Sequence, residues 1–423
     1  MLQVAHIRQH TEAVKQRLAV KHFTEIHLVD EVLALDDRRK QLTHRYDETQ
    51  AAINKASKEI GILMGKGEKD AAEQRKMEVA AFKENLQPIN RALADTEQLL
   101  HDTLVRLPNL PAAIVPEGRT PEENLNVKAW GNEPALPASA LPHWELIKKY
   151  DIVNFELGVK LTGSGFPVYK NKGARLQRAL ISYFLDYNTR AGYTEYIPPY
   201  MVNEATAYGT GQLPDKEGQM YFMPADNFYM IPTAEVPVTN IYRDEILKAT
   251  DLPLKMTAYT PCFRREAGSF GADVRGLNRV HQFDKVEIVQ LVHPDNSYEV
   301  LDEMVAHVEG LVQSLGLKYR ILRLCGGDMS FASALTYDFE VWSAAQKKWL
   351  ECSSVSNFES FQTNRMKIRF KDENGKTQLA HSLNGSSLAL PRIMAALLEN
   401  YQTENGIAIP DVLQHYTGFD HIA

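Results

Sequence analysis

Residues 260–289 read TPCFRREAGSFGADVRGLNRVHQFDKVEIV. The pattern predicts two strands with a polar, glycine-containing loop between them. Side chains alternate between the two faces of a strand, which places Arg264 and Glu266 on one face at the end of the first strand. If the second strand runs unbroken, Arg279, Phe283 and Glu287 share a face there. This surface offers guanidinium groups for phosphates, an aromatic plane for a base, and carboxylates for an ammonium or an exocyclic amine.

One ligand that carries all of these groups is an aminoacyl adenylate. The segment resembles motif 2 of the class II aminoacyl-tRNA synthetases, and the chain is similar to bacterial-type seryl-tRNA synthetases over essentially its whole length. Taken by itself, the segment is also compatible with a structural hairpin that carries surface arginines. The resemblance implies a homodimeric enzyme that activates L-serine with ATP and transfers it from seryl adenylate to the 3′ end of serine tRNA. Selenocysteine tRNA is a further candidate acceptor.

Composition places the chain among soluble, multidomain proteins. A length of 423 residues predicts two to three domains, and a hydrophobic content of 44% is ordinary for a globular protein. No long apolar run predicts a membrane span, and the polar N-terminus lacks a signal-peptide core. Three scattered cysteines, Cys262, Cys325 and Cys352, favour a reducing cytoplasm over a disulfide framework. No Cys/His cluster has the spacing of a zinc site, so we expect no zinc.

Residues 26–107 predict a long antiparallel helical hairpin. Side chains at alternating spacings of three and four residues form the pattern of a two-helix coiled-coil seam. The seam consists of Val32, Leu35, Arg39, Leu42, Tyr46, Thr49, Ile53, Ala56, Ile60 and Leu63, followed by Val79, Phe82, Leu86, Ile89, Leu93, Thr96, Leu100, Thr103 and Leu107. We expect the turn near Gly65 and Gly67, and each helix of about 30 residues reaches about 45 Å. Pro88 lies off the seam, where we expect a bend rather than a break.

Residues 1–107 form the first predicted domain. The pattern alone is equally typical of a dimerisation coiled coil or an inert spacer, whereas the resemblance implies an arm that reaches across the dimer and grips the long variable arm of the tRNA. A net charge of −7 argues against a generic nucleic-acid binder, so such a contact must depend on local basic patches. Recognition would follow backbone shape, because the A-form major groove is closed to side chains. The candidate phosphate contacts are Arg38, Lys40, Arg45, Lys55, Lys58, Lys69, Arg75 and Lys76.

The rest of the chain divides into a connector and a body. Residues 108–150 hold seven of the 20 prolines and predict a connector that is neither a helix nor a central strand. In the body, residues 151–423, the segment 174–190 predicts a helix that runs into a strand ended by Pro198 and Pro199. It resembles motif 1, the class II dimer element, although Tyr196 replaces the more usual aliphatic residue. The predicted fold is α+β: a coiled-coil arm and a class II synthetase catalytic and dimerisation domain with a mostly antiparallel sheet flanked by helices.

The resemblance implies a serine site built from three segments. In MIPTAEVPVTN, Thr233 and Glu235 are expected on one strand face, and Glu287 would complete a small anionic, hydroxyl-rich pocket. Such a pocket favours serine over alanine, because its polar groups stay unpaired when the substrate hydroxyl is absent. In HSLNGSSLALPRIMAALLENYQ, which resembles motif 3, Asn384 and Ser386 are expected at a turn. The implied serine contacts are Thr233, Glu235, Arg264, Glu287, Asn384 and Ser386.

The resemblance also implies an ATP site along motifs 2 and 3. Arg264 would hold the α-phosphate and the amino-acid carboxylate, while Glu266 reads the adenine amine and Phe283 stacks on the base. Arg279 and Arg392 would meet the γ-phosphate, the latter from the first turn of a helix. The implied ATP contacts are Arg264, Glu266, Arg279, Val280, Phe283, Glu351, Ser353, Ser354 and Arg392, and the implied catalytic residues are Arg264, Arg279 and Arg392.

The segment WLECSSVSNFESF contains the magnesium site that the resemblance implies, with Glu351 and Ser354 as ligands. Strict alternation faces Glu351 with Ser353, so either a β-bulge intervenes or Ser353 is the nearer hydroxyl. Two residues depart from the family pattern: Arg265 replaces the usual Ser of motif 2, and Pro391 replaces a Gly of motif 3. We expect neither to alter the chemistry, since Arg265 alternates to the other face and proline suits a first helical turn.

Two rival functions compete with tRNA charging. A synthetase-like ligase adenylates a small amino acid and charges a carrier protein, but paralogues of that kind lack the long arm that this sequence has. A non-catalytic coiled-coil protein on an inactive synthetase fold is disfavoured by the presence of Arg264, Glu266, Arg279, Glu351 and Arg392. No protein nucleophile is expected, because positioning and electrostatic stabilisation suffice for both transfer steps.

Overall fold

The structure is a computed structural model of the 423-residue chain, and it describes residues 1–215, 218–266 and 275–423. The glycine-containing part of the predicted hairpin loop, residues 267–274, lies outside the described residues. The chain divides into two compact units, residues 1–19 with 23–108 and residues 20–22 with 109–423. Of the described helices, none combines the length and apolar character that a membrane span requires.

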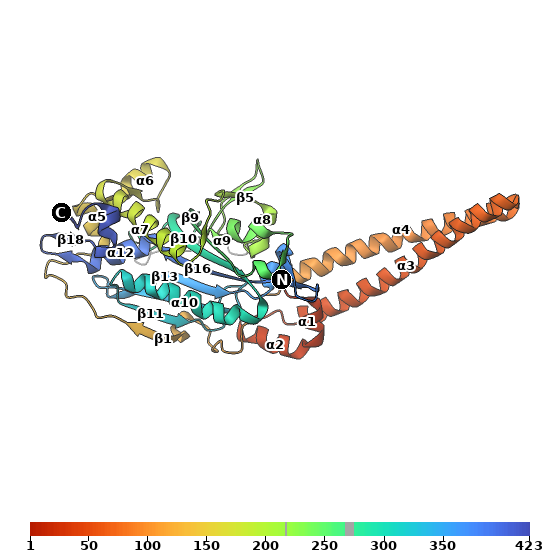
Figure 1. The fold of residues 1–423 in the computed structure, drawn as a ribbon, viewed down its shortest axis with the longest axis horizontal. Helices are drawn as coiled ribbons and strands as arrows, with labels where there is room; N and C mark the ends of the chain where they lie inside the picture. The colour runs from red at the N-terminus through yellow and green to blue at the C-terminus, as the bar shows by residue number, and fades with distance from the viewer. Residues whose placement is uncertain (216–217, 267–274) are drawn as a thin grey trace. The chain divides into compact units, whose positions relative to one another are not determined.

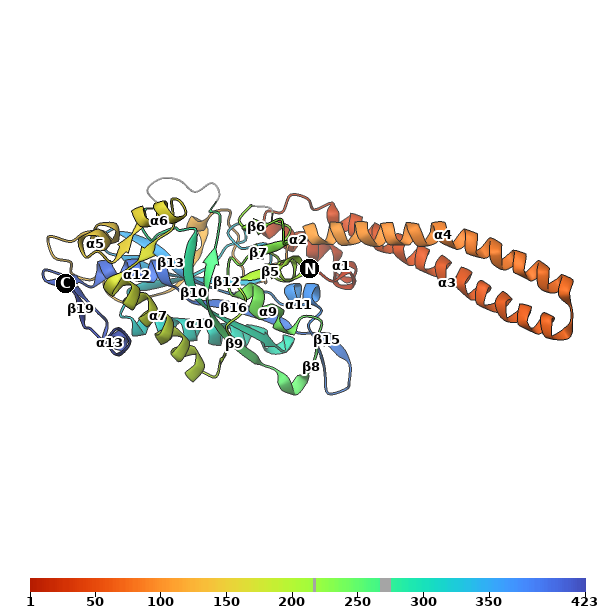
Figure 2. The ribbon, with the colours of Figure 1, turned by 90° about the horizontal axis from the view of Figure 1, so that it is seen from above.

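The first unit is helical (Figure 2). Its helices are α1 (Val4–Gln9), α2 (Thr11–Val20), α3 (Leu28–Lys66) and α4 (Lys69–Arg106). The last two lie side by side as the predicted hairpin, and Gly67 turns the chain between them with a φ of 82°. The predicted seam is confirmed, since the side chains buried along it include Val32, Leu35, Leu42, Ile53 and Ala56 of α3 and Val79, Ile89, Thr96, Leu100 and Thr103 of α4.

Pro88 lies inside α4, and the helix continues through it from Lys69 to Arg106. The side chain is exposed, one residue before the buried Ile89 of the seam. The expectation that the helix does not break at this proline is therefore confirmed, because the ring occupies the solvent face where a lost backbone hydrogen bond is satisfied by water. The bend at this position remains a prediction.

An eight-stranded sheet forms the centre of the second unit, with the strand order β1-β11-β12-β13-β16-β10-β9-β4 (Figure 1). All neighbours in it are antiparallel except β4 and β9, so the predicted mostly antiparallel sheet is confirmed. The strands are β1 (Leu125–Trp130), β4 (Thr194–Glu195), β9 (Leu254–Phe263), β10 (Gln282–Val292), β11 (Tyr319–Arg323), β12 (Leu335–Ser343), β13 (Lys348–Asn357) and β16 (His381–Ala389).

Helices α7 (Asn171–Arg190), α10 (Ser297–Ser314) and α12 (Leu390–Asn400) pack on this sheet. The largest apolar cluster of the unit joins them to the strands, with buried side chains such as Leu180, Leu311, Ile288 and Leu397. At about 25 cal/mol per Å² of apolar surface, burying side chains of this size contributes roughly 1.5–3 kcal/mol each. One face of the sheet is therefore fixed by the core, which leaves polar side chains of β10, β13 and β16 to line the other.

Smaller elements surround the sheet. The remaining helices are α5 (His143–Lys149), α6 (Phe155–Leu161), α8 (Glu204–Thr210), α9 (Glu235–Thr239), α11 (Phe361–Met366) and α13 (Asp411–Thr417). The remaining strands are β2 (Val153–Asn154), β3 (Val168–Tyr169), β5 (Met201–Asn203), β6 (Phe222–Met223), β7 (Phe228–Met230), β8 (Ile246–Lys248), β14 (Arg369–Lys371), β15 (Thr377–Leu379), β17 (Gln402–Thr403), β18 (Gly406–Ala408) and β19 (His421–Ile422).

Two sequence predictions need correction at this level. The proline-rich connector contains a helix, α5, because Pro142 directly precedes this helix without interrupting it. The strand β1 of the connector lies at the edge of the sheet and agrees with the prediction, which excluded only a central strand. The strand predicted before Pro198 and Pro199 ends earlier. It consists of Thr194 and Glu195. The N–H of the next residue, Tyr196, donates to the carbonyl of Thr257 in β9.

Candidate active site

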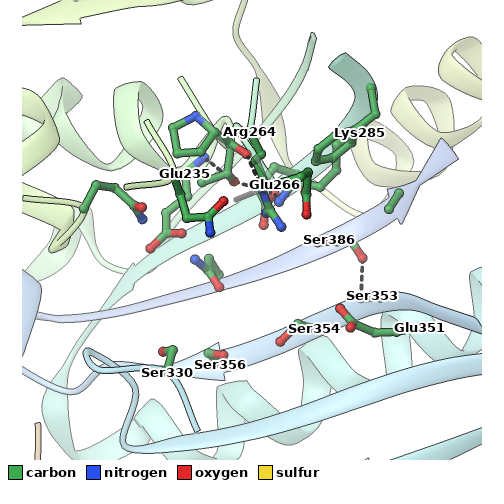
Figure 3. Close-up of a pocket in the computed structure, with 18 of the residues that line it drawn as sticks. Glu235, Arg264, Glu266, Lys285, Ser330, Glu351, Ser353, Ser354, Ser356 and Ser386 are labelled. Carbon is green, nitrogen blue, oxygen red and sulfur yellow. Dashed lines mark hydrogen bonds and ion pairs between the residues drawn. The ribbon is translucent and has the colours of Figure 1, made fainter. Parts of the chain in front are cut away.

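A cavity of about 820 Å³ lies over β10, β16 and β13 on the polar face of the sheet. Figure 3 shows Glu235, Arg264, Glu266 and Lys285 together in the upper half of the view, with the serine side chains of two neighbouring strands below them. Every residue predicted for the serine and ATP sites lines this cavity: Thr233, Glu235, Arg264, Glu266, Arg279, Val280, Phe283, Glu287, Glu351, Ser353, Ser354, Asn384, Ser386 and Arg392.

The hairpin of β9 and β10 brings the first group of side chains together, but not by strand alternation. β9 ends at Phe263, so Arg264 and Glu266 follow the strand, and Glu266 has a φ of 49°. β10 begins at Gln282, so Arg279 precedes the strand instead of sharing a face with Phe283. The two segments still meet, because Nε of Arg279 lies 3.1 Å from a carboxylate oxygen of Glu266. The prediction of shared strand faces was wrong here, although the predicted neighbours are correct.

Arg264 is held from three sides. Its N–H donates to the carbonyl of His281 at 2.9 Å, and its Nε donates to the carbonyl of Pro232 at 3.3 Å. The guanidinium carbon lies 5.2 Å from the centre of the Phe283 ring, within cation–π range. The ring Nδ1 of His281, a residue for which the sequence predicts no role, lies 3.1 Å from the Arg264 carbonyl. Backbone contacts thus fix the direction in which this guanidinium enters the cavity.

One end of the cavity is strongly acidic. Thr233, Glu235 and Glu287 are almost fully buried there, and the Thr233 hydroxyl donates to Glu287 at 3.0 Å. Thr233 and Glu235 do not share a strand face as predicted, because Ala234 already has helical angles and Glu235 begins α9. A strand was predicted here, but the chain turns into a short helix at Glu235, and both side chains line the cavity.

Glu235 is an unusual carboxyl group. Burial, together with the nearby Glu287 carboxylate, raises its pKa to about 7, although Gln362 donates a hydrogen bond to its Oε1 at 2.6 Å. A group with this pKa changes its charge near neutral pH, which gives the acidic end of the cavity a pH-dependent affinity for a cation.

Lys285 is the main site residue that the sequence analysis missed. Its ammonium group lies 2.5 Å from Glu287, and the side chain is only 8% exposed. Lys285 occupies the strand position midway between Phe283 and Glu287, so the alternation used for those two residues could have found it. The pairing offsets one of the two buried carboxylates and leaves the acidic end ready for a single positive charge.

β13 contains a β-bulge, which is one of the two alternatives that the sequence left open. The register with β12 pairs Phe339 with Ser353 and Glu340 with Glu351, so Cys352 is the extra residue. Next to the bulge, the Ser353 hydroxyl points toward β16 and donates to the carbonyl of Ser386 at 2.6 Å.

The other hydroxyl of the pair, that of Ser354, is hydrogen-bonded to Asp338. Burial raises the pKa of Asp338, and the Glu351 carboxylate raises it further. Its Oδ1 is a buried acceptor with no hydrogen-bond partner among the described residues. Glu351, Ser354 and Asp338 therefore bring several side-chain oxygen atoms close together at this part of β12 and β13.

β16 and α12 close the remaining wall. Asn384 and Ser386 lie inside β16 and not at a turn as predicted, because the strand runs straight into α12 at Leu390. Arg392 is on the first turn of that helix, as predicted. Its Nη1 donates to the carbonyl of Glu351 at 2.8 Å and lies 3.4 Å from the carboxylate of the same residue.

Comparisons with known proteins agree with this geometry. The family model of the seryl-tRNA synthetase N-terminal domain matches residues 1–111, and that of the tRNA synthetase class II core domain (G, H, P, S and T) matches residues 222–401. The serine–tRNA ligase of Salinibacter ruber is 47% identical, with 100% of this chain and 99% of that protein covered. That of Geobacter sulfurreducens is 45% identical, with 99% of both chains covered.

Solved structures give the same result. The seryl-tRNA synthetase of Pyrococcus horikoshii, crystallised with ATP, superposes with a TM-score of 0.92 at 32% identity, covering 100% of this chain and 99% of that one. The cytoplasmic serine–tRNA ligase of Naegleria fowleri, in complex with AMP, has a TM-score of 0.87 at 25% identity, covering 100% and 98%. The chain therefore belongs to the seryl-tRNA synthetase family, which combines a helical arm with a class II catalytic core.

Proposed function

We propose that this protein activates L-serine with ATP and transfers the seryl group to the 3′-terminal adenosine of serine tRNA. The observation that carries the proposal is a single cavity with two buried carboxylates at one end and three arginines along the other walls. A serine ammonium and hydroxyl fit the first end, and the phosphates of ATP fit the arginines. The activity places the protein in the cytoplasm, where tRNA is charged.

The acidic end is the proposed serine site. Glu235 and Thr233 receive the ammonium group, while Glu287 accepts a hydrogen bond from the side-chain hydroxyl. The Lys285 ammonium lies 2.5 Å from Glu287 and fixes the position of its carboxylate oxygens, which accept hydrogen bonds. Asn384 and Ser386 line the same cavity from β16 and complete the polar surroundings of the substrate. Alanine leaves this acceptor unpaired, which costs about 1–3 kcal/mol of binding free energy.

The proposed ATP site begins where Arg264 enters the cavity. Phe283 supplies the surface on which adenine stacks, and Glu266 accepts a hydrogen bond from the adenine amine while Val280 lies beside them. Nε of Arg279 lies 3.1 Å from the Glu266 carboxylate, so the arginine proposed for the γ-phosphate and the carboxylate proposed for the adenine amine are neighbours. An ATP molecule bent back over its own base can reach both groups.

Magnesium, which the resemblance implies, fits the oxygen cluster of β12 and β13. The half-exposed Glu351 and the Ser354 hydroxyl are the proposed ligands, and the unpartnered Oδ1 of Asp338 lies behind them. In the described part of the chain, no group of three or more His, Cys, Asp or Glu side chains is placed to hold a metal. A small number of protein ligands is typical of a magnesium ion that also binds phosphate oxygens. When bound, the ion would neutralise part of the polyphosphate charge.

In the proposed first step, a carboxylate oxygen of serine attacks the α-phosphorus of ATP in line. The bond from that phosphorus to the bridging oxygen breaks, and pyrophosphate leaves with the bonding pair. Arg264 neutralises the growing charge on the α-phosphoryl oxygens, and Arg279 and Arg392 hold the departing phosphates. In the second step, the 3′-hydroxyl of the terminal adenosine attacks the seryl carbonyl. The bond from that carbonyl carbon to the phosphate oxygen breaks, AMP leaves with the bonding pair, and the hydroxyl proton is released to solvent.

The arm is the proposed tRNA-binding element. Arg38, Arg45, Lys55, Lys58 and Lys69 are exposed and have no ion-pair partner among the described residues, so they are free to meet phosphates. The other three candidates, Lys40, Arg75 and Lys76, are paired within the arm with Asp36, Glu59 and Glu73. Breaking those pairs offsets part of the gain from a phosphate contact. We further propose that the protein acts as a homodimer, as the motif 1 resemblance implies.

The pKa of Glu235 makes a pH prediction. Only the ionised carboxylate pairs with the serine ammonium, so kcat/KM for serine should rise by about tenfold per unit below pH 7 and level off above it. Glu235→Gln should lower kcat/KM for serine about a hundredfold and abolish its rise with pH below pH 7. The check is the pH profile of serine-dependent pyrophosphate exchange between pH 5.5 and 8.5. A flat profile in the wild type, or a rise with pH that persists in the variant, would contradict the assignment.

The experiment that tests the function is ATP–pyrophosphate exchange with each of the twenty amino acids, followed by charging of serine tRNA. We expect exchange with serine alone and aminoacylation on addition of the tRNA. Exchange with alanine or glycine, without charging, would instead indicate the carrier-protein ligase. Absence of exchange with all amino acids would indicate an inactive paralogue.

A further inference from the structure

A fully buried histidine–glutamate pair lies next to the active-site cavity but outside it. Nδ1 of His143, the first residue of α5, is 2.8 Å from Oε1 of Glu399 near the end of α12. Both side chains are 0% exposed. The other ring nitrogen, Nε2, accepts a hydrogen bond from the backbone N–H of Leu277 at 2.9 Å. Leu277 lies two residues before Arg279, in the segment that forms one wall of the cavity.

The hydrogen bonds fix the protonation of this pair. Because a backbone N–H can only donate, Nε2 of His143 must be the bare nitrogen, and the proton is on Nδ1, where it is donated to Glu399. The Glu399 carboxylate also accepts from the Ser343 hydroxyl and from Gln346. Burial by itself raises the pKa of Glu399, but the hydrogen bonds from His143 and Ser343 outweigh it and hold the pKa below its usual value. Nδ1 of His143 therefore donates to the Glu399 carboxylate, while Nε2 accepts from the Leu277 backbone.

The approach of the chain to His143 requires glycine at position 276. Gly276 has a φ of 65°, which L side chains rarely adopt, and a Cβ there would lie 2.3 Å from Nε2 of the imidazole. The segment thus lies directly on the ring, at a distance that leaves no room for a side chain.

A second branch connects the same pair to Arg392. Gln346, bonded to Glu399 at 2.8 Å, accepts a hydrogen bond from the Asn278 side chain at 2.8 Å. The carbonyl of Asn278 in turn accepts from Nε of Arg392 at 3.1 Å. Since α12 carries Arg392 at its start and Glu399 near its end, one rigid helix links both ends of the network.

We propose that His143 and Glu399 are positioning residues that fix the backbone of residues 276–278, so that Arg279 and Arg392 together face the phosphates of ATP. The inference rests on the proposed function, because it assigns both arginines to the nucleotide. Neither His143 nor Glu399 lines the cavity, and they reach it through the backbone of Leu277 and through Gln346 and Asn278.

Two matched substitutions separate this role from a general contribution to packing. His143→Gln places an amide oxygen near the position of Nε2 and keeps the acceptor for Leu277, whereas His143→Asn places an amide nitrogen near the position of Nδ1 and keeps only the bond to Glu399. Both remove the ring and leave a similar cavity. We expect His143→Asn to raise KM for ATP about tenfold with KM for serine within about twofold, and His143→Gln to stay within about threefold of wild type for both.

ATP binding by calorimetry gives a second readout that does not need serine activation, and it should weaken in parallel with the rise in KM. Equal ATP affinities in the two variants, or a matching rise in KM for serine, would overturn the proposal. If the His143 variants fail to fold, Gln346→Met, at a partly exposed turn, replaces them: a rise in KM for ATP alone supports the network and unchanged values refute it. A wild type that binds ATP but does not activate serine would refute the proposed function while these binding comparisons still decide the inference.

Discussion

Replacing Arg264 with alanine is expected to reduce serine-dependent ATP–pyrophosphate exchange by about a thousandfold or more, with the melting temperature nearly unchanged. The guanidinium neutralises charge that develops on the α-phosphoryl group only in the transition state, and single groups of this kind contribute about a hundredfold to several thousandfold. The fold should persist, since the side chain is only partly buried and donates to the carbonyl of Pro232 at a long distance of 3.3 Å.

Arg265→Ala is the matched control for this experiment. The neighbouring arginine has the same chemistry, but its side chain is exposed, does not line the cavity, and lies 5.9 Å from the centre of the Tyr221 ring. We expect exchange within about threefold of wild type for this variant, as for most surface substitutions. Near-normal exchange in Arg264→Ala, or an equal loss in both variants, would show that transition-state stabilisation does not depend on this residue.

Replacing residues 30–105 with a short glycine–serine linker is expected to lower kcat/KM for tRNA charging at least about a hundredfold, while exchange stays within about twofold of wild type. The reason is that each phosphate contact adds an electrostatic, salt-dependent increment to tRNA affinity, whereas the complete cavity belongs to the second compact unit. Measuring both reactions on the same preparation separates the two contributions. A parallel loss of exchange would show that the arm is needed for adenylate formation itself.

Point substitutions in the arm refine this test. Lys55→Ala with Lys58→Ala removes two exposed lysines that have no ion-pair partner in the described part of the chain, so charging should weaken and the salt dependence of tRNA affinity should become less steep. Lys76→Ala is the control, because its ammonium is already paired with Glu73 at 3.0 Å. Equal effects of the two changes would argue that exposed charge on the arm does not decide tRNA binding.

Local periodicity in the sequence was sufficient to predict the helical arm. The seam from Val32 to Leu107 repeats at three- and four-residue spacings, and only two helices packed along that seam can bury it, so α3, α4 and the turn at Gly67 followed directly. The identities of the cavity residues could also be predicted from the sequence, because the motifs that resemble the family contain the residue types that a nucleotide and an amino acid require. All of the predicted ATP and serine residues line one cavity.

The backbone conformations around the site could not be predicted from the sequence in the same way. Strand alternation failed for Arg264, Glu266 and Arg279, which lie beyond the ends of β9 and β10, and for Glu235, which begins a helix. Alternation holds only while a strand continues, and where a strand ends is decided by pairing with its neighbours and not by its own sequence. The bulge at Cys352 belongs to the same class, since it exists only as a register difference between β12 and β13.

The sequence by itself pointed to the family, the coiled-coil arm and the set of residues that line the cavity, because each of these follows from spacing or residue type within a short segment. The tertiary structure decided which groups contact one another. The raised pKa of Glu235 and the pair of His143 with Glu399 beneath Leu277 depend on burial or on contacts between segments far apart in the chain. Such contacts follow from how the sheet and helices pack as a whole, and packing is a property that no single segment carries.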